Sequence, residues 1–116
     1  VLIGLHPYLS GRKATGLAFG VDLNVIKKPL PTSITQIHHG IENDFNILNL
    51  DFDYSLEGLA EQGVLLLNLS LTGDEENVDK HIELWKSLMY YVFNALGKNR
   101  DVVYVGLNKE CLTYQK

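Results

Sequence analysis

Apolar positions along the chain fall into two patterns, short continuous runs and longer stretches with helical spacing. Continuous runs over residues 1–5, 64–67 and 102–105 are bounded by polar or turn-forming residues, which is typical of buried strands. Helical spacing is clearest over 78–96, where apolar residues recur every three or four positions until Gly97. The connections between the runs are long enough for crossovers, so the pattern predicts parallel strands.

Two shorter helices are predicted between the first two strands. Residues 33–36 fit a capping box, and isoleucines then recur at helical spacing, so a short helix is expected to begin near Ile34. Ser55 is expected to cap a second helix over 56–62, which Gly63 would end.

The remaining segments complete the predicted architecture. Residues 17–26 are expected to form a loop or short strand, 45–54 a surface excursion, 74–77 a polar loop, and 107–116 the start of a helix. We therefore predict one α/β domain over residues 1–116, with three α/β/α layers around a short parallel central sheet of three or four strands. Because a predicted element is cut at each end, we expect the domain to be incomplete at both ends.

The composition is that of a folded domain. Hydrophobic residues make up 46% of the 116 residues, and no apolar run approaches the length of a membrane span, so no membrane partner is expected. Cys111 is the only cysteine, which excludes an internal disulfide and favours a reducing compartment, the cytoplasm or the nucleus. We interpret Cys111 as structural, because a reactive thiol needs basic neighbours.

Charge is distributed unevenly along the chain. The net charge of −4 argues against binding nucleic acid by electrostatics alone. Two basic pairs, Arg12-Lys13 and Lys27-Lys28, are typical of solvated loops but also suit phosphate contacts at one edge. Acidic residues gather over 42–61 and 74–83, and the surface from Asp44 to Glu61 is suited to docking a protein partner.

Common functional motifs are absent from the sequence. It has no P-loop, no dinucleotide-binding glycine pattern, no zinc-like Cys/His spacing and no Gly-x-Ser-x-Gly elbow. His38 and His39 are adjacent and cannot both face one metal ion from a regular element, so we interpret them as helix-surface residues. No metal and no cofactor are expected.

Six short segments occur in a fixed order along the chain. They are Gly4 to Leu9, Gly16 to Gly20, Leu30 to Ile34, Gly63 to Thr72, Trp85, and Val103 to Gly106. This ordered set, spread over nearly the whole chain, resembles the motifs of the uracil-DNA glycosylase family. Residues 63–68 reproduce the family's Gly-Val-Leu-Leu-Leu-Asn strand without change. The resemblance implies a base pocket at the carboxyl ends of the strands.

The resemblance assigns a recognition role to three residues of that pocket. Phe19 would stack on a base rotated out of the nucleic acid, and Tyr8 would exclude the methyl group of thymine. Asn68 would bind the uracil edge through its amide, which both donates and accepts hydrogen bonds. Two structural alternatives remain open: Phe19 as an ordinary core side chain, and Asn68 as the partner of a nearby loop.

The resemblance also implies a DNA-backbone surface and a substituted catalytic centre. The backbone contacts would be made by Arg12, Lys13, Pro31, Ser33 and Gly106. His6 stands at the position of the family's water-activating aspartate. This change removes a negative charge from where positive charge develops in the transition state, although a neutral histidine can orient or deprotonate water.

A second difference concerns the family's catalytic histidine and leucine wedge. Both lie in a His-Pro-Ser-Pro-Leu-Ser segment, and this chain ends at Lys116 before such a segment would appear. Recognition is therefore better represented in the sequence than catalysis.

Three hypotheses follow. The leading one is a domain that binds single- or double-stranded DNA or a uracil-like base, with glycosylase activity impaired or lost, in a viral or phage setting. The alternatives are an active uracil-excising hydrolase of base excision repair that uses His6, and a replication or interaction subunit with a vestigial pocket.

Overall fold

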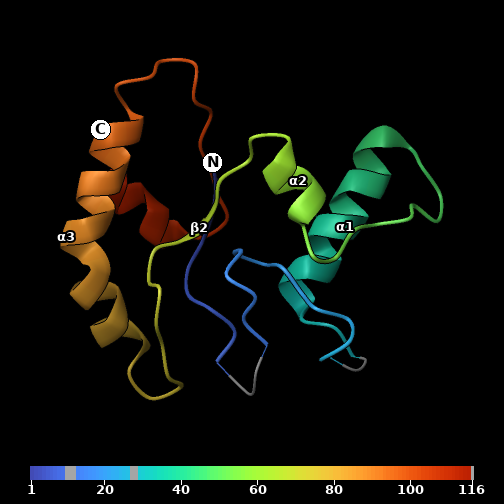
Figure 1. Ribbon diagram of the computed structural model, residues 1–116, viewed down its shortest axis with the longest axis horizontal. Helices are drawn as coiled ribbons and strands as arrows, with labels where there is room; N and C mark the ends of the chain where they lie inside the picture. The colour runs from blue at the N-terminus through green and yellow to red at the C-terminus, as the bar shows by residue number, and fades with distance from the viewer. Residues whose placement is uncertain (10–12, 27–28, 116) are drawn as a thin grey trace.

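A short parallel sheet lies at the centre of the fold. The computed structural model describes residues 1–9, 13–26 and 29–115 (Figure 1). β1 (Leu2–Gly4) pairs in parallel with both β2 (Leu66–Asn68) and β3 (Val105–Gly106), which gives the strand order β2-β1-β3. The predicted parallel three-strand sheet is confirmed.

Helices lie on both sides of this sheet, in the three layers that the sequence predicts. In Figure 1, α1 (Thr32–Phe45) and α2 (Glu57–Glu61) lie on one side of the strands. The opposite side holds α3 (Val78–Leu96) and a 3-10 helix, η1 (Lys109–Tyr114). The architecture is therefore a small α/β fold, and its best-packed part lies toward α1 and α2.

The main core fills the space between the sheet and α1. It contains six buried residues contributed by the loop after β1, by α1, by the start of α2 and by β2: Ala18, Val21, Ile26, Ile34, Leu56 and Leu66. On the α3 side, Leu69 and Met89 are also buried. Burial of this apolar surface fixes the loop over 13–26 against β2, and the loop does not form a strand there.

The start of α1 differs from the predicted capping box. The helix begins at Thr32, with Pro31 at the N-cap and no side-chain cap hydrogen bond. Proline presets the backbone for a helix start, and the Thr35 hydroxyl bonds the Thr32 carbonyl at 2.8 Å. Ser33 therefore has no capping role, and α1 extends over 14 residues.

α2 is capped by a cluster that includes the predicted Ser55. Leu56 occupies the N-cap with a φ of 60°, while the Ser55 hydroxyl accepts a hydrogen bond from the Glu57 N–H at 3.2 Å. Asp53 accepts one from the Gly58 N–H at 3.0 Å. The predicted cap is thus made by two side chains, and Gly63 follows the helix with a φ of 90°.

The third strand was predicted as buried, and this is wrong. β3 contains only Val105 and Gly106, and both are exposed, as are Val103 and Tyr104. β3 is an edge strand that pairs only with β1 among the described residues, so an apolar run is not enough to bury it.

Two further predictions need correction. Residues after Leu107 form the 3-10 helix η1 instead of an α-helix. The second strand begins at Leu66, two residues later than predicted, and Leu65 is exposed.

The excursion over 45–54 is only partly a surface feature. Phe45 and Leu48 are 71% and 91% exposed. Phe52 and Tyr54 instead pack on His38, with ring centroids 4.7 and 5.5 Å away, and the Tyr54 hydroxyl lies 2.8 Å from His38 Nδ1. The prediction that His38 is a surface residue is therefore wrong, because this aromatic cluster covers it.

None of the helices in the part of the chain that the structure describes is long and apolar enough to cross a membrane.

Candidate functional site

A cavity of about 530 Å³ opens where β1 and β2 end. Its walls include the loop after β1, the loop over 14–19, the start of α1 and the end of β2. The lining residues that matter for its chemistry are His6, Tyr8, Phe19, Ser33, Asn68 and Leu71. All of them except Leu71 are predicted site residues, although Ser33 was assigned to the DNA backbone.

Gly4 lies beside two recognition residues, Asn68 and Phe19. A Cβ atom at Gly4 would collide with Oδ1 of Asn68 and would lie 3.0 Å from the Phe19 ring. The lack of a side chain therefore allows the amide and the ring to approach each other across the end of β1. The backbone register supports this arrangement, since Gly4 pairs with Asn68.

The Asn68 side chain has no hydrogen-bond partner within the described residues. Its position at the last residue of β2 directs a polar amide to the cavity at the sheet's carboxyl edge. A structural bond to a nearby loop would have satisfied this amide, and none is found in the described part of the chain. The amide is therefore available to a ligand.

Phe19 adopts a backbone conformation that is unusual for a bulky residue. Its φ is 66°, in the left-handed region, and the Tyr8 hydroxyl donates a hydrogen bond to its carbonyl at 2.8 Å. The neighbouring Ala18 N–H bonds the Leu66 carbonyl at 3.3 Å, which ties this loop to β2. Such strain persists only where the surroundings impose it, and it occurs often at binding sites.

Tyr8 is held firmly in the cavity wall. Burial raises the pKa of its hydroxyl, and the Ser33 side chain partly offsets this rise. The hydroxyl therefore stays protonated near neutral pH, as its donation to the Phe19 carbonyl requires. This hydrogen bond joins Tyr8 to the backbone of Phe19.

His6 presents one ring nitrogen that can accept a proton. Its Nδ1 lies 2.8 Å from the carbonyl oxygen of Pro7, which can only accept, so Nδ1 carries the proton. In the neutral ring Nε2 then keeps its lone pair. This nitrogen can orient a water molecule, but it supplies no negative charge.

The predicted DNA-backbone residues do not all lie together. Ser33 lines the cavity, and Pro31 caps the helix that carries it. Gly106 pairs with Ile3 at the end of β3 and lines a different cavity, of about 760 Å³, together with Cys111. Lys13 is half-buried near the first cavity's loop.

Arg12 and the Lys27-Lys28 pair lie outside the described residues.

Cys111 packs against Gly106, and burial raises the pKa of its thiol, which agrees with a structural role.

Comparison with known proteins identifies relatives that match along almost the whole chain. A Ureaplasma parvum protein is 36% identical over 115 residues, which cover 98% of this chain and 52% of the relative. Relatives from Actinobacillus succinogenes and Azotobacter vinelandii are 34% and 36% identical over 104 residues, and cover 87% and 89% of this chain. All three are named uracil-DNA glycosylase.

The chain belongs to the uracil-DNA glycosylase family. It spans about half the length of the curated relatives it matches. No family model matches the chain.

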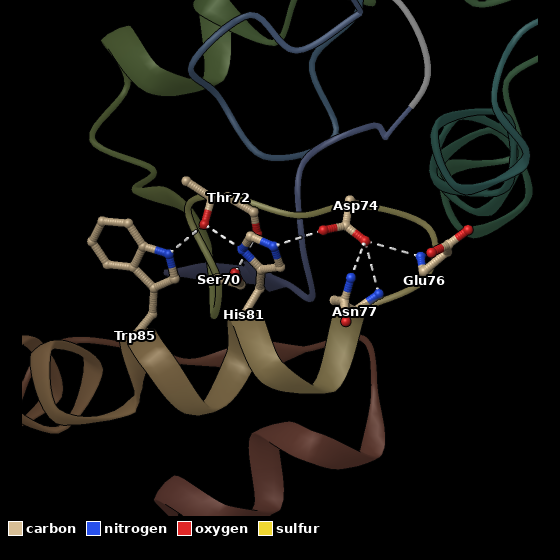
Figure 2. Close-up of polar contacts among 7 residues, drawn as sticks. All are labelled: Ser70, Thr72, Asp74, Glu76, Asn77, His81 and Trp85. Carbon is tan, nitrogen blue, oxygen red and sulfur yellow. Dashed lines mark hydrogen bonds and ion pairs between the residues drawn. The ribbon is translucent and has the colours of Figure 1, made fainter.

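This uracil-DNA glycosylase-family chain also contains a polar network that the sequence analysis missed. Figure 2 shows His81 between two partners: its Nδ1 lies 2.7 Å from the Thr72 hydroxyl, and its Nε2 lies 3.1 Å from Asp74. The Trp85 indole N–H donates to the same hydroxyl at 2.8 Å. Because a carboxylate only accepts, Nε2 donates to Asp74, and in the neutral ring Nδ1 accepts from Thr72.

Asp74 anchors this network at the start of α3. One carboxylate oxygen accepts hydrogen bonds from the Glu76 N–H at 3.0 Å and from the Asn77 N–H at 2.8 Å. The side chain of Asn77, followed by His81, holds the pKa of Asp74 below its ordinary value. The carboxylate therefore stays charged and holds the loop that leads into α3, and its bond to His81 ties this loop to the first turn of the helix.

The segment that carries this network contacts the loop after β1, and part of that loop lines the cavity. Gly73 lies against Leu9 and the Cβ of His6, and the Ser70 N–H donates to the Leu5 carbonyl at 2.9 Å. Ser70, which is fully buried, also donates its hydroxyl to the Thr72 carbonyl. The spacing of His81 and Trp85, four residues apart on one helix face, is the sequence signal that could have indicated this contact.

The described residues contain no group of three or more His, Cys, Asp or Glu side chains able to hold a metal ion.

The Thr72–His81–Asp74 chain does not line the base cavity, and the Trp85 N–H already occupies one lone pair of the Thr72 hydroxyl. We therefore interpret this network as support for the cavity walls.

Proposed function

We propose that this chain is a uracil-recognising domain that binds DNA or a uracil-like base, with N-glycosylase activity impaired or lost. The observation that carries the proposal is the meeting of Tyr8, Phe19 and Asn68 in one cavity. The name of the relatives, uracil-DNA glycosylase, supports uracil as the base and DNA as the partner.

Each of the three residues supplies a different part of the recognition. The Phe19 ring offers a flat face on which a base flipped out of a single or double strand stacks. The Asn68 amide, unpaired among the described residues, offers a donor and an acceptor to the uracil edge. The rigid Tyr8 ring would occupy the space that a thymine methyl group needs.

The DNA strand is proposed to run along the edge formed by Pro31 and Ser33, with Arg12 and Lys13 as phosphate contacts. These two basic side chains add local positive charge to an acidic chain. Gly106 remains a proposed backbone contact, although it lines the other cavity. A reducing compartment, the cytoplasm or nucleus, remains part of the proposal because the chain has a single cysteine, and a viral or phage setting remains a prediction.

The impaired activity is proposed on the chemistry of His6. Cleavage of the glycosidic bond develops positive charge on the sugar, and a carboxylate at this position would stabilise that charge. A neutral imidazole provides no such stabilisation, and a protonated one would oppose it. Binding is therefore expected to survive better than catalysis.

One observation favours an active enzyme as the alternative. With its Nδ1 proton held by the Pro7 carbonyl, His6 keeps an Nε2 lone pair that can accept a proton from water. Another observation favours a protein-binding subunit: the acidic surface from Asp44 to Glu61 carries the exposed side chains of Phe45 and Leu48.

The proposal is tested with a labelled single-stranded oligonucleotide that contains one uracil, measuring both binding and release of free uracil. We expect saturable binding with little or no uracil release, and His6→Asp is expected to raise release at least tenfold. Rapid release by the natural chain that His6→Ala abolishes would instead establish the active alternative. Absence of binding would refute the proposal.

The binding site is tested by separate variants. Phe19→Ala removes the stacking face, and combined neutralisation of Arg12 and Lys13 removes phosphate contacts, so both are expected to weaken binding at least tenfold. The control is Asn24→Ala, an exposed substitution in the turn over 22–25, which should leave affinity unchanged. Unchanged affinity in both test variants would favour the protein-binding subunit.

A further inference from the structure

The hydroxyl of Tyr8 is the point where three segments of the cavity wall meet. Tyr8 belongs to the loop after β1, and its hydroxyl donates a hydrogen bond at 2.8 Å to the Phe19 carbonyl, on the loop over 13–26. Its other partner is the side chain of Ser33, the second residue of α1. All three residues line the base cavity, so this junction lies within the proposed site.

The direction of the second hydrogen bond follows from the first. A carbonyl oxygen can only accept, so the single proton of the Tyr8 hydroxyl is committed to Phe19. The Tyr8 oxygen is left to accept, and the Ser33 hydroxyl is therefore the donor. This direction agrees with the electrostatics: burial raises the pKa of Tyr8, and the Ser33 hydroxyl opposes that rise because it stabilises the phenolate.

The start of α1 places Ser33 for this contact. Pro31 occupies the N-cap and no side-chain cap hydrogen bond is formed there, so the Ser33 hydroxyl is not used for capping. The next residue, Ile34, is fully buried in the main core, which fixes the first turn of the helix. The Ser33 side chain is thus held beside Tyr8 by packing that lies entirely within the described residues.

We propose that Ser33 is a positioning residue for base specificity, which holds the Tyr8 ring in the space that a thymine methyl group needs. This inference rests on the proposed function, in which Tyr8 excludes thymine. Without the Ser33 hydroxyl, the Tyr8 hydroxyl keeps one anchor, the Phe19 carbonyl, and the ring can turn about that single bond. Precise placement matters here, because one methyl group changes affinity by only about 10- to 200-fold even in a well-fitted pocket.

The Ser33 hydroxyl cannot serve Tyr8 and a DNA phosphate at the same time. It has one proton, and a phosphate oxygen that took this proton would break the bond to Tyr8. The proposed path of the DNA strand along Pro31 and Ser33 is unaffected, since backbone N–H groups in the first turn of a helix have no intrahelical partner. The two roles of the hydroxyl therefore predict different effects of its removal.

The test compares the Kd values of two labelled single-stranded oligonucleotides that differ only in one base, uracil or thymine. In Ser33→Ala the uracil preference should fall about threefold or more, because the thymine strand binds more tightly while the uracil strand keeps its affinity. Ser33→Thr keeps a hydroxyl and should restore the preference. The matched control is Thr35→Ala: it removes a hydroxyl that lies near the start of the same helix and bonds the Thr32 carbonyl.

The contact is also tested without nucleic acid. NMR of the chain labelled at tyrosine Cζ follows the ionisation of each phenol, and Tyr8→Phe identifies the Tyr8 signal. Loss of the donor in Ser33→Ala should raise the pKa of Tyr8 further. Ser33→Thr and Thr35→Ala should leave the Tyr8 titration unchanged.

Each failure would contradict a different claim. Equal weakening of both strands in Ser33→Ala would assign the hydroxyl to a phosphate and overturn the inference. An unchanged uracil preference or an unchanged Tyr8 titration in Ser33→Ala would also overturn it, while the proposed function would stand. A natural chain that does not distinguish uracil from thymine would refute the proposed function, and the role of Ser33 with it.

Discussion

Gly4 is the residue whose lack of a side chain leaves room for two cavity residues, Asn68 and Phe19. The Asn68 amide and the Phe19 ring both lie close to it, and both proposed recognition roles depend on that placement. Phe19 in turn needs the Tyr8 hydroxyl to hold its strained backbone. The proposed site is therefore a unit of residues that position one another, and single substitutions in it should affect more than one contact.

Gly4→Ala is predicted to close the cavity and destabilise the fold. The added methyl group must displace either the amide or the ring, which costs about 1 to 3 kcal/mol of unfolding free energy. Urea denaturation measures this loss, and oligonucleotide binding should be lost with it. The control is Gly40→Ala, because Gly40 lies in α1 with nothing within 4 Å of the added Cβ.

The two glycine variants are expected to change the unfolding free energy in opposite directions. Alanine favours the helix over glycine, so Gly40→Ala should raise the unfolding free energy by about 0.5 to 1 kcal/mol. A Gly4→Ala chain as stable as the natural one would contradict the close approach of Asn68 and Phe19 to Gly4.

At the scale of elements, the start of α2 depends on one carboxylate. Hydrogen bonds hold the pKa of Asp53 below its ordinary value of 3.8. The bond from the Ser55 side chain has the largest effect, and the bond from the Gly58 N–H has the next largest. Because the pKa is lowered by folding, the stabilisation is complete above the unfolded pKa and is lost as pH falls through the folded one. A neutral amide in place of this carboxylate has only one oxygen to accept these bonds and carries no charge to strengthen them.

Asp53→Asn is predicted to lower the melting temperature at pH 7. The difference from the natural chain should shrink as pH falls below 3.8 and through the lowered pKa of Asp53, where this side chain itself becomes protonated. Melting curves by circular dichroism across this range test the prediction. Asp51→Asn serves as the control, since Asp51 is exposed and makes no hydrogen bond within the described residues; a parallel pH profile for the two variants would contradict the role of Asp53.

Local pattern predicted the elements better than their ends and their burial. The long helical spacing over 78–96 matches α3 closely, because many periodic positions agree. The run over 102–105 failed as a buried strand, since burial at a sheet edge depends on neighbours that the run itself does not encode. The coverage of His38 by Phe52 and Tyr54 likewise depends on contacts across a loop.

At the scale of the whole molecule, the fold brings together residues that are far apart in the chain. The resemblance predicted that Tyr8, Phe19 and Asn68 belong to one pocket, and the structure gathers all three around one cavity. Their roles remain predictions. The Thr72–His81–Asp74 network was missed because its members come from a loop and a helix that only the folded chain brings into contact.

The most direct test of the central claim is the preference of the chain for uracil over thymine. Fluorescence anisotropy would compare two labelled single-stranded oligonucleotides that differ only in one base, uracil or thymine. We predict several-fold tighter binding to the uracil strand, because Tyr8 excludes the extra methyl group, and loss of this preference in Tyr8→Ala but not in Asn24→Ala. Equal affinity for the two strands, or an unchanged preference in Tyr8→Ala, would contradict uracil recognition by this cavity.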